Sequence, residues 1–134
     1  MLMTDPGYPC NRHFLRLVEG EGQLVPVGPE QRYQLNAELA AAYWQPNTRG
    51  VMVASPANPS GEILSREQLQ ALFELCQQRQ GHLIVDEIYH GLSFGEDAPS
   101  ILSLTDEAFV INSFSTILNN VFQNASSIRT GKFI

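Results

Sequence analysis

With 134 residues, of which 43% are hydrophobic and 16% are charged, the chain can bury one modest core and has the composition of a globular domain. Eight basic residues against 14 acidic ones leave a net charge of −6. Because no basic stripe could neutralise a row of phosphates, and no run of about 18 apolar residues could cross a bilayer, nucleic acid and membrane are excluded as expected partners.

The two cysteines, Cys10 and Cys76, have no neighbours at metal-ligand or redox-motif spacing. Such isolated residues are typical of reduced thiols. We therefore expect a cytoplasmic protein.

Residues 11–20 predict a helix, because apolar side chains recur at near-helical spacing before Gly20, which can end it. These apolar side chains are Phe14, Leu15, Leu17 and Val18. Residues 23–27 (QLVPV) then favour a short edge strand, since Pro26 cannot donate a ladder hydrogen bond.

Residues 34–44 are rich in helix formers and predict a second helix. Its expected apolar stripe consists of Leu35, Leu39 and Ala42 or Tyr43. Residues 50–55 (GVMVAS) then predict an apolar strand, which the turn sequence PANPSG ends.

The third predicted helix begins after Ser65, a good N-cap residue with Gln68 three positions on, and ends at Gly81. Its expected buried stripe consists of Leu69, Leu72, Phe73 and Cys76. Two further apolar strands follow, HLIVDE and AFVINSFS. Strands that alternate with helices predict an α/β fold of three layers, in which helices flank a mostly parallel sheet.

Polar side chains follow three of the predicted strands. Asn58 follows the first, Asp86 and Tyr89 the second, and Ser113 and Ser115 the third. Because ligands bind beyond the carboxyl ends of strands in such sheets, these residues are candidates for one common site.

Four motifs in this order carry a family resemblance: DPGYP (residues 5–9), ASPANPSG (54–61), VDEIYHGL (85–92) and NSFS (112–115). Together they resemble the middle of a class I/II aminotransferase, an enzyme of fold type I that uses pyridoxal 5′-phosphate. The resemblance covers residues 4–115. It implies amino-group transfer between an amino acid and a 2-oxo acid.

The resemblance also implies roles for single residues. Asp86 would pair with the pyridine nitrogen of the cofactor and keep it protonated, so that the ring withdraws electrons from the substrate. Tyr89 and Asn58 would donate hydrogen bonds to the ring oxygen, and Tyr8 would stack on the ring face. Ser113 would hold the phosphate.

One further expectation concerns the backbone at Asn58. Its bond to Pro59 is a candidate cis peptide, because linkages to proline permit this isomer at modest cost.

The sequence departs from the family at Thr116. The family pattern is Ser-x-Ser-Lys, and its lysine forms the Schiff base with the cofactor. A threonine hydroxyl cannot form that bond, and the only lysine of the chain is Lys132. Arg129 to Gly131 faintly resemble the family's phosphate-binding arginine segment. Covalent cofactor binding is therefore not expected.

Two segments result: residues 1–115, a partial large domain of an aminotransferase, and residues 116–134, a tail that does not match the family. The family's phosphate loop and small domain are missing. The alternative is a catalytically inactive, truncated fragment that only folds or self-associates. Because a partial sheet exposes strand edges and apolar faces, we expect a homo-oligomer.

Other interpretations compete with the site residues. Asp86 and Glu87 could simply solvate the end of a strand. The set of His82, Asp86, Glu87 and His90 could suggest a metal site, but His82 and Asp86 are spaced unfavourably, and we assign no metal ligand. A nucleotide hydrolase is excluded, because its Gly-x4-Gly-Lys-[Ser/Thr] motif is absent.

Overall fold

The computed structural model describes residues 1–93, 98–113 and 126–130, with side chains up to residue 112. A central sheet contains the strands in the order β2-β1-β3-β4-β5-β6. The first five strands run parallel, and β6 runs antiparallel to β5. In chain order the strands are β1 (Leu2–Asp5), β2 (Gln23–Pro26), β3 (Gly50–Ala54), β4 (His82–Asp86), β5 (Phe109–Ser113) and β6 (Ser126–Thr130).

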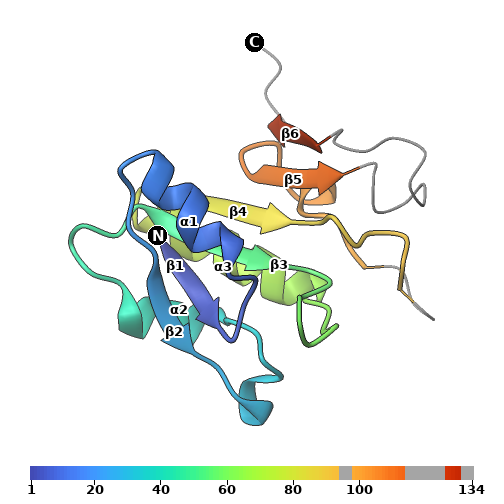
Figure 1. Ribbon diagram of the computed structural model, residues 1–134, viewed down its shortest axis with the longest axis horizontal. Helices are drawn as coiled ribbons and strands as arrows, with labels where there is room; N and C mark the ends of the chain where they lie inside the picture. Colours follow the sequence, from blue (N-terminus) through green and yellow to red (C-terminus); the bar gives the residue numbers. More distant parts are fainter. Residues whose placement is uncertain (94–97, 114–125, 131–134) are drawn as a thin grey trace.

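Three α-helices flank the sheet: α1 (Cys10–Leu17), α2 (Ala37–Tyr43) and α3 (Arg66–Gln78). Helix α1 lies on one face of the sheet, and α2 and α3 lie on the other (Figure 1). Two short 3₁₀ helices, η1 (Pro29–Gln31) and η2 (Ile101–Ser103), lie in the connections. The expected three-layer α/β fold with a mostly parallel sheet is confirmed.

The core lies between the sheet and the helices α2 and α3. Alternate residues of the central strands point into it, among them Val51, Val53, Leu83 and Val85. Helix α3 contributes Leu69, Leu72, Leu75 and Cys76. The expected stripe of this helix is correct except that Phe73 is only partly buried and Leu75 belongs to it.

Helix α3 begins as expected from the sequence. The Gln68 N–H donates to Ser65 Oγ at 3.2 Å, and the Ser65 N–H donates to Gln68 Oε1 at 2.8 Å. These two bonds form a capping box. After the helix, a Cβ on Gly81 would lie only 2.9 Å from the ring atoms of Trp44, so a glycine is required where the indole packs.

The expected stripe of the second helix is partly wrong. Helix α2 begins only at Ala37, because Asn36 caps it by accepting a 2.8 Å hydrogen bond from the Leu39 N–H. Leu35 is buried but precedes the helix, and Ala42 and Tyr43 are exposed. Leu39 does pack against the core, as expected, and the other residues on that face are three alanines and the terminal indole: Ala37, Ala40, Ala41 and Trp44.

At the β2 edge of the sheet, the structure contains one strand more than the sequence predicts. Strand β2 is an edge strand, as Pro26 predicts, but β1, which separates it from β3, is not evident from the sequence. Helix α1 is confirmed, and three apolar side chains on it or just after it are exposed: Phe14 by 60%, Leu17 by 80% and Val18 by 75%. No helix in the described ranges is long and apolar enough to cross a membrane.

Candidate functional site

The candidate site lies where the parallel strands end. The register aligns Ala54, the last residue of β3, with Asp86, the last residue of β4. The segment after β3 therefore starts beside Asp86, and the segment after β1 leads within three residues to Tyr8. Parallel strands deliver their following loops to one edge of the sheet, and this geometry brings the expected residues together.

Asn58 and Tyr89 are in direct contact. The Asn58 Nδ2 amide donates a hydrogen bond of 3.3 Å to the Tyr89 hydroxyl. This bond joins the loop after β3 to the turn after β4. The Asn58–Pro59 peptide is cis, as expected, and so are Asp5–Pro6 and Ser55–Pro56.

Asp86 is buried, with 6% of its surface exposed. Its Oδ1 atom accepts a 3.2 Å hydrogen bond from the Ile88 N–H. Burial raises the pKa of this carboxyl, and the Ile88 bond opposes that rise only in part. The ion pairs among the described residues join Arg32 to Glu62 and Glu87 to His90. Asp86 thus has no cationic partner in this part of the chain.

Tyr8 lies at the same edge, 40% exposed. A hydrogen bond with the Cys10 side chain is the main cause that raises the pKa of its hydroxyl, and the nearby Tyr89 and Asp86 contribute to the rise. Both cysteines are free thiols.

Two hollows meet at Asn58. The smaller, of about 230 Å³, is lined by Tyr8, Asn58 and residues of β1 and β3. The larger, of about 540 Å³, lies on the side of Tyr89 and is lined by Ile63 and Leu92. Ala57, Asn58 and Pro59 line both hollows. The Asn58 side chain therefore stands between two spaces that a ligand could occupy.

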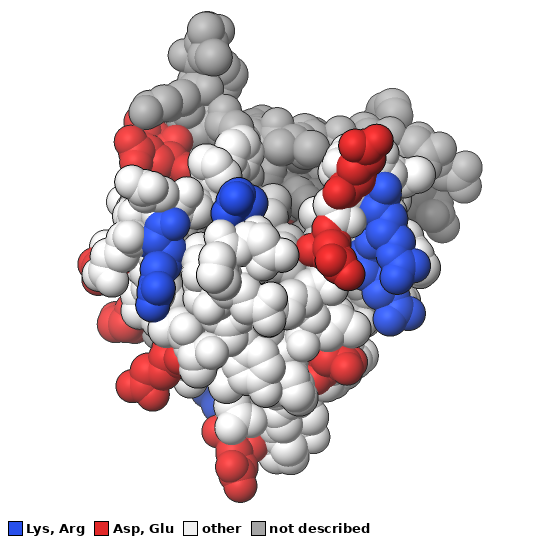
Figure 2. Space-filling model, turned by 90° about the vertical axis from the view of Figure 1, so that its left-hand side faces the viewer, with Lys and Arg blue, Asp and Glu red and all other residues white. Residues whose placement is uncertain are grey.

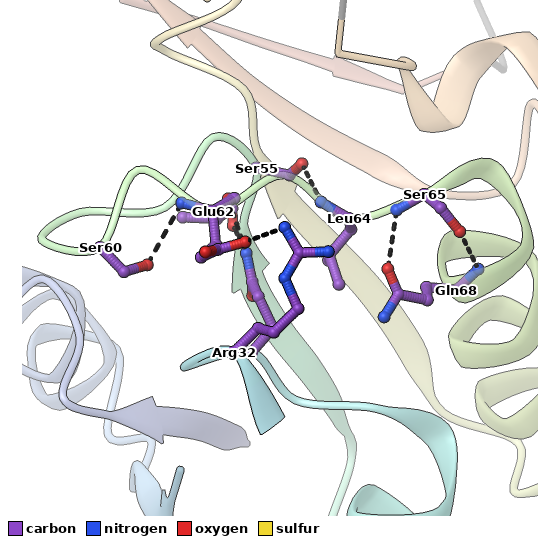
Figure 3. Close-up of polar contacts among 9 residues, drawn as sticks. Arg32, Ser55, Ser60, Glu62, Leu64, Ser65 and Gln68 are labelled. Atoms are coloured by element: carbon purple, nitrogen blue, oxygen red, sulfur yellow. Dashed lines mark hydrogen bonds and ion pairs between the residues drawn. The ribbon is translucent and has the colours of Figure 1, made fainter. Parts of the chain in front are cut away.

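Several polar contacts fix residues 55–65, which we call the Asn58 loop (Figure 3). At its ends, the Leu64 N–H donates to Ser55 Oγ at 3.0 Å. In between, the Ala57 N–H donates to the Glu62 carbonyl at 2.9 Å. The Glu62 carboxylate forms an ion pair with Arg32 at 2.5 Å. The loop is thus closed on itself and attached to the segment before α2.

Glu87 holds the turn that carries Tyr89. This carboxylate is 2% exposed, and its Oε1 accepts a 2.9 Å hydrogen bond from the Ile101 N–H at the start of η2. Its Oε2 lies 3.8 Å from His90 Nδ1. The alternative interpretation, that Glu87 simply solvates a strand end, is wrong, because the side chain is buried and bonded to the backbone.

These supporting contacts have no local signal in the sequence. An acidic residue next to Asp86 gives no signal of whether it faces water or a backbone N–H. The Gln34 carboxamide, which contacts the Asn58 loop, lies more than twenty positions before Asn58 and belongs to no motif.

Ser113 ends β5, where its backbone pairs with Ser126 of β6. Its side chain, together with Ser115, Thr116 and Lys132, lies outside the described part of the chain. No group of three His, Cys, Asp or Glu residues in that described part could hold a metal ion.

The described residues fit a pyridoxal-phosphate ring. Asp86 is a buried carboxylate without a cationic partner among them, and a protonated ring nitrogen would supply one. The Asn58 amide and the Tyr89 hydroxyl are hydrogen-bond donors suited to a ring oxygen. Tyr8 adds an aromatic face to one of the two adjoining hollows.

Comparison with known proteins yields one consistent family. The family "Aminotransferase class I and II" matches residues 1–120. The valine–pyruvate aminotransferase of Mycobacterium tuberculosis is 41% identical over 116 residues, which cover 84% of this chain and 29% of that protein. The arginine–pyruvate transaminase of Pseudomonas aeruginosa is 39% identical over 94 residues, covering 68% of this chain and 24% of the relative.

Solved structures agree with this result. The crystal structure of an aminotransferase from Mycobacterium tuberculosis superposes with a TM-score of 0.77 at 40% identity, covering 85% of this chain and 30% of that one. A Pyrococcus protein shares the fold alone, with a TM-score of 0.88 at 22% identity and coverage of 96% and 34%. The chain therefore spans less than a third of the length of the curated relatives reported above.

Proposed function

The chain belongs to the aminotransferase class I and II family, and on this premise we propose that residues 1–115 are the central part of the large domain of a pyridoxal-phosphate-dependent enzyme. Residues 116–134 would form a tail, of which β6 pairs with β5 in the same sheet. The whole enzyme would transfer an amino group between an amino acid and a 2-oxo acid. Pyruvate is the favoured 2-oxo acid, since the names of both relatives above include it.

The observation that carries the proposal is the hydrogen bond between Asn58 and Tyr89 beside the buried Asp86. Asp86 would hold the proton on the ring nitrogen of the cofactor, and Asn58 and Tyr89 would donate to the ring oxygen. Tyr8 would pack on the ring face, and Ser113 would bind the phosphate. The cofactor itself would supply an electron sink for the substrate's α carbon.

Thr116 limits what this chain can do alone. A lysine amine would bind the cofactor covalently and move a proton, and a threonine hydroxyl can do neither. We therefore propose that this chain binds the cofactor without a covalent bond and does not complete a transamination cycle. The second candidate function, a fragment that only folds or self-associates, is favoured by the same residue.

The test compares two probes on the full chain. Pyridoxamine 5′-phosphate cannot react with a lysine, so its binding, measured by calorimetry, reports the pocket alone. Pyridoxal 5′-phosphate followed by borohydride reduction reports covalent attachment by mass spectrometry. We expect binding of the first probe and no specific reduced adduct with the second.

A Thr116→Lys variant is the matched gain-of-function control. It should give a reduced adduct at position 116 while its affinity for pyridoxamine phosphate stays close to that of the parent chain. If neither chain binds either probe, the second candidate function replaces the first. An adduct at Lys132 in the parent chain would refute the absence of covalent attachment.

Two further properties belong to the same proposal. Self-association is supported by the exposed apolar side chains of α1 and by the edge strand β2. A cytosolic location is supported by the two free thiols. The distribution of charge also agrees with small-molecule substrates. On the face of the molecule that Figure 2 shows, acidic and basic side chains are scattered around a broad uncharged area.

A further inference from the structure

We infer that Gln34 is a positioning residue, which holds the Asn58 loop so that Asn58 meets Tyr89. This inference rests on the proposed function where it concerns the cofactor, but its structural part does not. The relation joins three segments that are distant in sequence: the segment before α2, the loop after β3 and the turn after β4.

The side chain of Gln34 joins the end of β3 to the interior of the Asn58 loop. Its Nε2 atom donates to the carbonyl of Ala54, the last residue of β3, at 3.0 Å, and to the carbonyl of Glu62 at 3.0 Å. Both N–H groups of one amide are thus used on the backbone just before and within the loop. A carboxamide is suited to this task because it offers two donors in a fixed planar arrangement.

Burial of Gln34 makes its two hydrogen bonds hard to replace. Gln34 is 4% exposed, so water cannot readily replace its hydrogen bonds to the two carbonyls. The Glu62 carbonyl also accepts the Ala57 N–H, and the Ala57 carbonyl accepts the Gly61 N–H at 2.7 Å. Ala57 immediately precedes Asn58. The chain of contacts therefore runs from Gln34 to the backbone that carries the Asn58 side chain.

The backbone before Gln34 supports the same interpretation. Arg32 and Tyr33 both have positive φ angles, 51° and 55°, although neither is a glycine. Such a conformation is unfavourable for L-residues and persists only where the surrounding structure requires it. Here the two strained residues immediately precede Gln34, whose amide contacts the Asn58 loop. The Arg32 side chain also forms an ion pair with Glu62 of that loop (Figure 3).

The test needs a readout that separates a local effect on the Asn58 loop from a general loss of stability. We propose hydrogen exchange of single amide protons in the full chain, without any ligand. In Gln34→Met, which keeps the length but removes both donors, the Ala57 and Gly61 amide protons should exchange at least about tenfold faster. Amide protons of α3, such as that of Leu72, should keep their rates.

Two further variants keep the test decisive. Gln23→Met is the matched control, because Gln23 donates one amide hydrogen bond, at 2.9 Å, to the Tyr43 carbonyl away from the loop. It should leave Ala57 and Gly61 unchanged. Arg32→Ala removes only the ion pair of a 73% exposed arginine and should change these rates less than about threefold.

Binding of pyridoxamine 5′-phosphate tests whether the structural role of Gln34 also affects cofactor binding. If the parent chain binds it, Gln34→Met should weaken that affinity about tenfold and Gln23→Met should not. If the parent chain does not bind it, the proposed function fails, while the exchange rates still decide the role of Gln34. Unchanged rates at Ala57 and Gly61 in Gln34→Met, or equal acceleration throughout α3, would overturn the inference.

Discussion

The Asn58 amide donates to the Tyr89 hydroxyl at 3.3 Å, and this bond joins two loops that follow neighbouring parallel strands. Neither residue is deeply buried in the structure. The contact thus leaves both polar groups in the lining of the larger hollow.

The coupling between these two side chains can be measured by a double-mutant cycle of Asn58→Ala and Tyr89→Phe. A net contribution of about 0.5–1.5 kcal/mol to the free energy of unfolding is expected, as for a typical hydrogen bond between neutral groups. Urea titrations of the four chains give this value. Pairing Asn58→Ala with Tyr43→Phe, at an exposed tyrosine of α2, should give additive effects. Additivity in the first cycle would contradict the contact.

Asp86 should make stability depend on pH. At pH values below its ordinary pKa of 3.8 the carboxyl is neutral in both the folded and the unfolded chain. Between 3.8 and the raised pKa of the folded state, the folded chain keeps a proton that the unfolded chain has released. The free energy of unfolding should therefore fall as pH rises through this window and stay lowered above it.

An Asp86→Asn variant should remove this dependence and be more stable than the parent chain at pH 7, while it binds pyridoxamine phosphate more weakly. Thermal unfolding followed from pH 3 to 8 measures the first effect. Asp106→Asn, at an exposed position, serves as the control and should leave the pH profile unchanged. A parent chain that gains stability steadily across the window would contradict the prediction.

Glu87 should contribute to stability through its acceptor atom. Glu87→Ala leaves the buried Ile101 N–H without a partner, which costs about 1–3 kcal/mol. Glu87→Gln keeps an oxygen acceptor and should cost less. Glu74→Ala, on the exposed side of α3, should change the free energy of unfolding by no more than about 0.5 kcal/mol. Equal effects of Glu87→Ala and Glu74→Ala in urea titrations would rule out this role.

The exposed apolar side chains of α1 predict self-association. Leu17→Glu places a charge where an apolar contact is expected and should weaken association about tenfold or more, as measured by sedimentation velocity over a range of concentrations. Gln78→Glu adds the same charge at an exposed position of α3, on the other face of the sheet, and should have no effect. A parent chain that is monomeric at all concentrations would contradict the expectation.

Local signals in the sequence were sufficient for the elements that obey them. Ser65 and Gln68 predict the start of α3 correctly because a capping box depends on residues three positions apart. The motif around Asp86 likewise predicts a strand that ends in polar side chains, because continuous apolar residues followed by carboxylates leave few alternatives.

Elements that depend on tertiary contacts were not predicted. Strand β1 has only four residues, and its pairing with β2 and β3 defines it more than its composition does. The inner face of α2 combines Leu39 and Trp44 with three alanines that allow close approach to the sheet, so a search for large apolar residues finds Leu39 but misses the alanines. Gln34 reaches the Asn58 loop only through the folded arrangement of three segments.

The packing of Trp44 against Gly81 gives the chain a built-in optical reporter. Trp44 is its single tryptophan, and Gly81 precedes β4 at the end of the strands opposite to Asp86. The five residues of β4 separate the two ends by roughly 13 Å. Indole emission therefore follows unfolding of the α2 to β4 region without direct contact from a ligand at Asn58, so folding and binding can be monitored as separate signals in one sample.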